Sequence, residues 1–177
     1  AITERAMRGE LDFEASLKER VSTLKGLPIS VFDAVRSEIK VTSGVPELIA
    51  RVKAEGGHVG VVSGGFHEVL DVLAERLGLD FWRANRLEVA EGHLTGRVLG
   101  TVIDAKAKAQ ALLEWADLTQ TPVARTVAIG DGANDLEMMR VAGLSIAFNA
   151  KPIVQEQADV AINKPNMALA LPLIGLT

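Results

Sequence analysis

The stretch that decides the fold runs from Thr126 to Asp135 and reads Thr-Val-Ala-Ile-Gly-Asp-Gly-Ala-Asn-Asp. Its first four residues, 126–129, are apolar or β-branched, which predicts a short buried strand. A helix is expected from Asn134 to Ala142, so Asp131 and Asp135 stand where a strand passes into a helix. Two carboxylates held this close repel each other unless a cation is present. A small number of hard oxygen ligands favours Mg²⁺.

A second interpretation of the same residues needs no metal. Asp131 or Asn134 could cap the helix, and Asp135 could stabilise the positive end of its dipole. That interpretation accounts for one carboxylate easily and for two poorly. The spacing therefore favours a magnesium site formed by Asp131 and Asp135.

Strands and helices alternate on both sides of this stretch. The pattern predicts buried strands at 58–63, 144–148 and 158–162, helices at 66–76 and 105–117, and a hairpin of 84–89 with 95–99. Strands that alternate with helices of about 10–15 residues indicate right-handed βαβ units. We expect an α/β fold with a Rossmann-like, mostly parallel sheet.

The N-terminal part of the chain has a different pattern. Residues 1–41 read as helices without a strand partner, and 42–177 contain the alternating elements. We therefore expect a helical cap over 1–41, inserted between the first and second strands of the core, and an α/β core over 42–177.

Length and composition exclude several classes of protein. The chain has 177 residues, 48% of them hydrophobic, a formal net charge of −4 and no cysteine. Such a chain is not disordered, and its acidic balance argues against general nucleic-acid binding. The absence of cysteine suits a reducing compartment. No apolar stretch reaches the roughly 20 residues of a membrane span, so we expect a cytoplasmic protein.

Two further motifs follow predicted strands, where ligands bind in open α/β sheets. Ser63-Gly64-Gly65 offers a hydroxyl and bare backbone N–H groups for an anion, although an ordinary helix cap has the same sequence. Lys106 and Lys108 open the helix at 105. A lysine there is either solvated or directed at a bound phosphate, and the sequence alone does not separate the two interpretations.

Taken together, these segments resemble the haloacid dehalogenase-like superfamily, and within it the phosphoserine phosphatase family. The likeness rests on residues 6–21, on Val61-Val62-Ser63-Gly64-Gly65-Phe66, on Lys108, on Gly130-Asp131-Gly132-Ala133-Asn134-Asp135 and on 147–152. It implies Mg²⁺-dependent hydrolysis of the small molecule O-phospho-L-serine, the last step of serine biosynthesis, through an aspartyl-phosphate.

The resemblance also implies a role for individual residues. Ser63, Lys108 and Asp135 would be catalytic, Asp131 would ligate Mg²⁺, and Asp135 would hold that site in register. The substrate would be bound by Ser63, the Gly64 N–H, Lys108, Asn134 and, in the cap, Arg20, Met7 and Phe13. Arg20 would pair with the substrate carboxylate, while Met7 and Phe13 would shield the pocket from water.

One motif of the family is absent from the sequence. The family's nucleophile and acid/base lie in an Asp-x-Asp-x-Thr motif at the end of a central strand, and these 177 residues contain no such motif. We expect it in an upstream segment, and we expect a gap in the sheet without it. The resemblance also allows a homodimer and an upstream regulatory domain that binds an amino acid.

Other functions remain open at this point. A related phosphatase or phosphotransferase that acts on another small phosphate ester, such as one of homoserine, would share the core motifs. Arg20 would separate phosphoserine from an ester without a carboxylate, such as a sugar phosphate, since that substrate does not need it. A fragment of a cation-pumping ATPase and a non-catalytic phosphate-binding module are the remaining alternatives.

Overall fold

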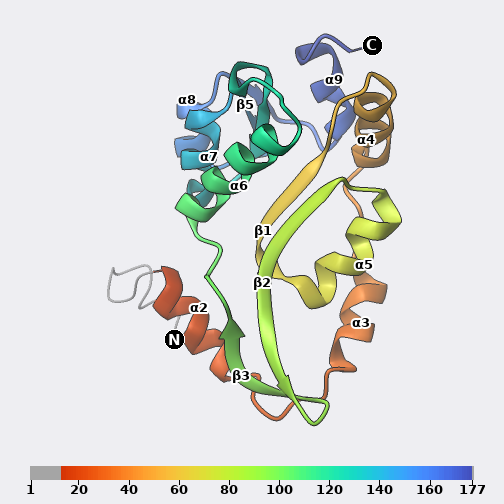
Figure 1. Ribbon diagram of the computed structural model, residues 1–177. Helices are drawn as coiled ribbons and strands as arrows, with labels where there is room; N and C mark the ends of the chain where they lie inside the picture. The colour runs from red at the N-terminus through yellow and green to blue at the C-terminus, as the bar shows by residue number, and fades with distance from the viewer. Residues whose placement is uncertain (1–12, 177) are drawn as a thin grey trace.

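The computed structural model describes residues 13–176 as an α/β fold with two three-stranded sheets (Figure 1). The strands are β1 (Gly60–Phe66), β2 (Phe81–Ala90), β3 (His93–Leu99), β4 (Val127–Gly130), β5 (Leu144–Phe148) and β6 (Val160–Ile162). The α-helices are α2 (Phe13–Ser22), α3 (Val31–Glu38), α4 (Val45–Ala54), α5 (His67–Leu77), α6 (Ala105–Leu118), α7 (Leu136–Val141), α8 (Pro152–Gln157) and α9 (Ala170–Leu173). Short 3-10 helices are η1 (Val123–Arg125), η2 (Ala133–Asp135) and η3 (Met167–Leu169).

The pairing of the strands is mostly parallel, as the alternation of strands and helices predicts. One sheet has the order β1-β2-β3, in which β1 and β2 are parallel and β2 and β3 form an antiparallel hairpin. The other has the order β4-β5-β6 and is parallel throughout. Among the described residues, β1 and β4 are therefore edge strands of separate sheets, although Val62 on β1 packs against the cluster that contains Ala128 on β4.

Two of the hydrophobic clusters among the described residues lie at opposite ends of the long strands. Helices α2 and α3 pack on the hairpin through Val21, Phe32, Leu87 and Leu94, each at most 7% exposed. The second cluster lies among α6, α7, α8 and strands β4 and β5. Residues 100–104 connect the hairpin to α6 and thus join the two ends (Figure 1).

One predicted turn lies inside a strand. Gly64 and Gly65, expected to follow β1, belong to it, and the pairing with β2 is irregular between Val62 and Phe66. Val62 pairs with Arg83 and Phe66 with Asn85, so more residues lie on β1 than on β2 across this interval. Because the parallel ladder resumes at Phe66, the glycines form a bulge rather than a loop.

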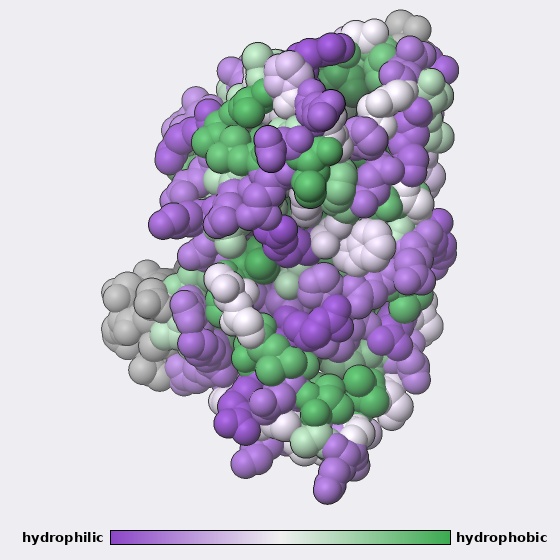
Figure 2. Space-filling model, viewed as in Figure 1, coloured by the Kyte–Doolittle hydropathy of each residue, from purple (hydrophilic) through white to green (hydrophobic). Residues whose placement is uncertain are grey.

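Figure 2 shows one face of the molecule, on which hydrophilic and hydrophobic residues are mixed. Hydrophilic residues cover much of this face and separate the hydrophobic ones into several small groups. None of the helices between residues 13 and 176 has the length and apolar character to cross a membrane.

Candidate active site

A buried ion pair lies at the carboxyl end of β4. Lys108 on α6 donates from Nζ to Oδ1 of Asp135 at 2.7 Å, and both residues are 6% exposed. The other oxygen, Oδ2, accepts the backbone N–H groups of Asp131 at 3.0 Å and Gly132 at 3.1 Å. The Asp135 carboxylate thus fixes the loop that carries Asp131 and, at the same time, the end of Lys108.

This loop folds tightly because of its first glycine. A Cβ atom on Gly130 would lie 2.4 Å from the Cβ of Asp135, a distance at which neighbouring groups must move. Only glycine allows β4 and the end of η2 to approach so closely. The Gly-Asp-Gly spacing therefore has a steric reason that is independent of any ligand.

The Asp131 side chain has a different environment from that of Asp135. Asp131 is exposed, and its backbone carbonyl accepts the N–H of Lys151 at 3.1 Å. Within residues 13–176 its carboxylate makes no hydrogen bond or ion pair. No cluster of three or more metal-ligating side chains occurs among residues 13–176. One carboxylate with water and a substrate phosphate still fits Mg²⁺, which commonly takes only one or two protein carboxylates.

The structure separates the two candidate lysines. Lys108 is buried against Asp135, whereas Lys106 is exposed on the first turn of α6. The helix begins at this point because Asp104 caps it, accepting the N–H of Ala107 at 2.8 Å. Of the two, only Lys108 contacts another predicted site residue within the described range.

The bulge in β1 presents the second candidate motif. The Gly65 N–H donates to Ser63 Oγ at 3.0 Å, so the hydroxyl accepts from its own turn and retains its proton for another acceptor. Next to it, the Gly64 carbonyl accepts from Asn85 Nδ2 at 2.9 Å. Asn85 is 1% exposed and was not expected from the sequence, because a single asparagine in a strand carries no local signal.

The cap residues are placed in part. A Cβ atom on Gly64 would lie 3.5 Å from Cζ of Phe13, so the first residue of α2 lies directly over the bulge. Arg20 is exposed in the last turn of the same helix, about two turns from Phe13 and on the same side of it. Asn134 lies on η2 beside the Asp131 loop. Met7 lies outside the described residues.

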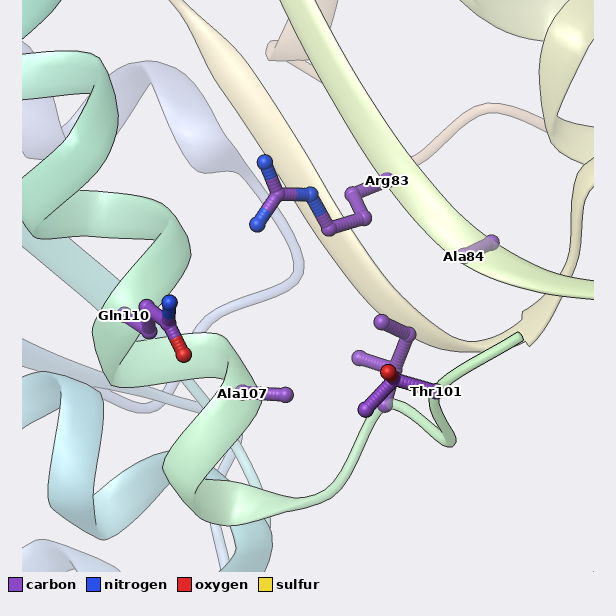
Figure 3. A pocket seen from close by; sticks show the side chains of 6 residues that line it. Arg83, Ala84, Thr101, Ala107 and Gln110 are labelled. Atoms are coloured by element: carbon purple, nitrogen blue, oxygen red, sulfur yellow. The ribbon is translucent and has the colours of Figure 1, made fainter.

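A separate cavity lies between β2, the segment that precedes α6, and α6 itself. It has a volume of about 320 Å³ and is lined by Arg83, Ala84, Thr101, Ile103, Ala107 and Gln110 (Figure 3). Arg83 and Gln110 both bind the Glu114 carboxylate, at 2.7 Å and 2.8 Å. Because Arg83 and Gln110 already bind Glu114 and none of the predicted site residues lines the cavity, we do not assign the substrate to it.

The mostly parallel α/β sheets, with a buried lysine–aspartate pair at a strand end, place the chain among α/β proteins that bind ligands at the carboxyl ends of strands. The chain belongs to the haloacid dehalogenase-like hydrolase family, whose model matches residues 3–140. Within this family it groups with the phosphoserine phosphatases, so the resemblance read from the sequence is confirmed.

Two relatives and one solved structure illustrate the match. The chain is 53% identical over 176 residues to a phosphoserine phosphatase of Streptomyces coelicolor, covering 99% of this chain and 43% of the relative. It is 48% identical to that of Streptococcus thermophilus, covering 98% of this chain and 80% of the relative. A phosphoserine phosphatase structure with a phospho-aspartyl intermediate analogue superposes with a TM-score of 0.88 at 46% identity, covering 97% of this chain and 82% of that one.

Proposed function

We propose that this chain provides the phosphate and substrate site of an Mg²⁺-dependent phosphatase that hydrolyses O-phospho-L-serine. The observation that carries the proposal is the buried Lys108–Asp135 pair, which holds a cationic Nζ next to the exposed Asp131. A buried lysine beside a carboxylate that is free for a cation suits an anionic phosphoryl group. The relatives named above support phosphoserine as the substrate.

Each residue then has a distinct task. The Ser63 hydroxyl and the Gly64 N–H hold phosphate oxygens, Lys108 neutralises charge on the transferring group, and Asn134 contacts the phosphate. Asp131 would hold Mg²⁺, while Asp135, whose oxygens are engaged, keeps the loop and Lys108 in register. When bound, the ion would offset the negative charge that builds up on the phosphoryl oxygens.

The nucleophile lies outside these 177 residues in this proposal. An upstream segment would supply an Asp-x-Asp-x-Thr motif on a strand that pairs with the free edges of β1 and β4. Its first carboxylate attacks phosphorus, the bond to the serine oxygen breaks and that oxygen takes a proton from the second aspartate. Water then hydrolyses the acyl phosphate, which releases phosphate and restores the carboxylate. The phospho-aspartyl analogue in the related structure supports this route.

The cap would set the choice of substrate. Arg20 would bind the substrate carboxylate with its planar guanidinium, and Phe13, which lies over Gly64, would exclude water together with Met7. We divide the chain at about residue 41 into cap and core, and we place the enzyme in the cytoplasm, which suits a chain without cysteine. A homodimer and an upstream amino-acid-binding domain remain part of the proposal.

Kinetics on two substrates test this function in the polypeptide that includes the upstream segment. Arg20→Ala should raise KM for O-phospho-L-serine about 10–100-fold, the loss expected for one charge-assisted contact. It should change KM little for O-phosphoethanolamine, which has the same amine and phosphate without the carboxylate. Lys18→Ala on the same helix, where Lys18 pairs with Glu14, is the control. Equal effects of Arg20→Ala on both substrates would refute the assignment.

A further inference from the structure

The Gly64–Gly65 peptide group is held at both of its polar ends. Its carbonyl oxygen accepts from Asn85 Nδ2 at 2.9 Å, and its N–H donates to Ser63 Oγ at 3.0 Å. A peptide group is planar, so these two hydrogen bonds fix one rigid unit. Between two glycines such a unit is otherwise free to rotate, because neither residue has a side chain to restrict it.

The hydroxyl of Ser63 takes its orientation from this unit. Since Oγ already accepts the Gly65 N–H, its own proton points elsewhere. The hydrogen bonds therefore form one chain from the Asn85 amide through the Gly64–Gly65 peptide to the Ser63 hydroxyl, in which each donor polarises the next. A phosphate oxygen in front of Ser63 would be its final acceptor.

Asn85 is itself fixed from the other side. Its Oδ1 accepts the N–H of Ile103 at 2.8 Å, and both residues are buried, at 1% and 4% exposure. Ile103 also lines the 320 Å³ cavity, so the connection between β3 and α6 has fewer packing contacts on the side that faces this cavity. The Asn85 amide thus has its acceptor and one donor hydrogen satisfied, which leaves its plane little freedom.

We propose that Asn85 is a positioning residue that orients the Ser63 hydroxyl toward the substrate phosphate through the Gly64–Gly65 peptide. This inference rests on the proposed function, since it assigns Ser63 a phosphate contact. Asn85 does not touch substrate. The orientation of the Ser63 hydroxyl matters most in the transition state of phosphoryl transfer. We therefore expect kcat to depend on Asn85 more than KM does.

The test uses Asn85→Asp in the polypeptide with its upstream segment. The introduced carboxylate still accepts the Ile103 N–H but has no proton to donate to the Gly64 carbonyl. At pH 7.5 we expect kcat for O-phospho-L-serine to fall about 100-fold. Added to Ser63→Ala, the same change should lower kcat by less than about threefold, because the hydroxyl it orients is gone. Protonation at lower pH restores a donor, so the ratio of variant to wild-type kcat should rise toward pH 5.

Controls separate positioning from general destabilisation and from failure of the proposed function. Ser145→Ala removes another buried hydroxyl, bonded to Asp159 at 2.8 Å, and should lower stability without changing kcat. Independent effects of Asn85→Asp and Ser63→Ala, or a kcat ratio that is constant with pH, would overturn the inference. If the wild-type protein does not hydrolyse O-phospho-L-serine, the proposed function is wrong. The role of Asn85 can then still be tested by hydrogen exchange of the Gly65 amide, which should be faster in Asn85→Asp. An unchanged exchange rate would show that Asn85 does not hold the Gly64–Gly65 peptide.

Discussion

Lys108 and Lys106 are two residues apart in the sequence but lie in different surroundings. Lys108 is 6% exposed and bonded to Asp135 at 2.7 Å, whereas Lys106 is exposed. Removing one partner of a buried ion pair leaves an uncompensated charge in the interior. The two lysines therefore offer a matched comparison on one helix.

We expect Lys108→Met to lower the free energy of unfolding by about 3–5 kcal/mol and the rate of phosphate release by at least about 100-fold. Lys106→Met should change stability by less than about 0.5 kcal/mol and leave turnover near the wild-type rate. Urea unfolding and a phosphate-release assay measure both. Similar losses in the two variants would contradict the arrangement.

For individual residues, the sequence predicts part of the candidate site. The spacing of Asp131 and Asp135 indicates paired carboxylates at a strand end because both lie within one short motif. It does not indicate that the carboxylate oxygens of Asp135 accept hydrogen bonds from Lys108 and two backbone amides. Asn85 escapes prediction altogether, since its partners Gly64 and Ile103 are distant in the sequence and only the fold brings them together.

Helix α5 and strand β2 are joined by a polar contact centred on Asp71. Its carboxylate accepts from Trp82 Nε1 at 2.9 Å and Arg86 at 3.0 Å and bonds to His67 Nδ1 at 2.6 Å. Partial burial raises the pKa of Asp71, but the hydrogen bonds from His67, Trp82 and Arg86 outweigh it, so the pKa lies below its ordinary value. The charged form is therefore favoured in the folded protein.

The sign of the pH dependence follows from this shift. A lowered pKa stabilises the fold above the ordinary value of 3.8, and that stability is lost as the pH falls through the folded-state pKa. We expect Asp71→Asn to lower the free energy of unfolding by at most about 1 kcal/mol at pH 7, because the group is partly exposed. In urea titrations the difference from wild type should shrink below about pH 4. A difference that stays constant between pH 7 and pH 3 would contradict this role.

Element boundaries were predictable where the signal is local. Residues 144–148 form β5 as expected, and α6 begins at Ala105 where Asp104 caps it. Strand β2 begins at Phe81, ahead of the predicted 84, because Phe81 and Trp82 pair with Gly60 and Val61 on β1. Pairing between segments 21 residues apart does not change the hydrophobic pattern of either segment, so the start of β2 could not be predicted from it.

The whole molecule combines two sheets whose edge strands β1 and β4 have one unpaired side within the described residues. Edge strands carry backbone N–H and C=O groups that have no hydrogen-bond partner on one side and can pair with another strand. If an upstream strand pairs with both, their amides gain protection. Hydrogen exchange of residues 1–177 alone and with the upstream segment should show β1 and β4 at least about tenfold slower in the longer chain, relative to β5. Unchanged ratios would argue against a shared strand.

The central claim is that Asp131 and Lys108 hold a metal-bound phosphoryl group at the end of β4. The most direct measurement is Mg²⁺ titration of phosphate release from O-phospho-L-serine by the polypeptide with its upstream segment, compared with Asp131→Asn and with Glu137→Gln, an exposed acid on α7. We predict Mg²⁺-dependent turnover in wild type and Glu137→Gln, and a loss of at least about 100-fold in Asp131→Asn. Equal turnover and equal Mg²⁺ dependence in all three proteins would contradict the account.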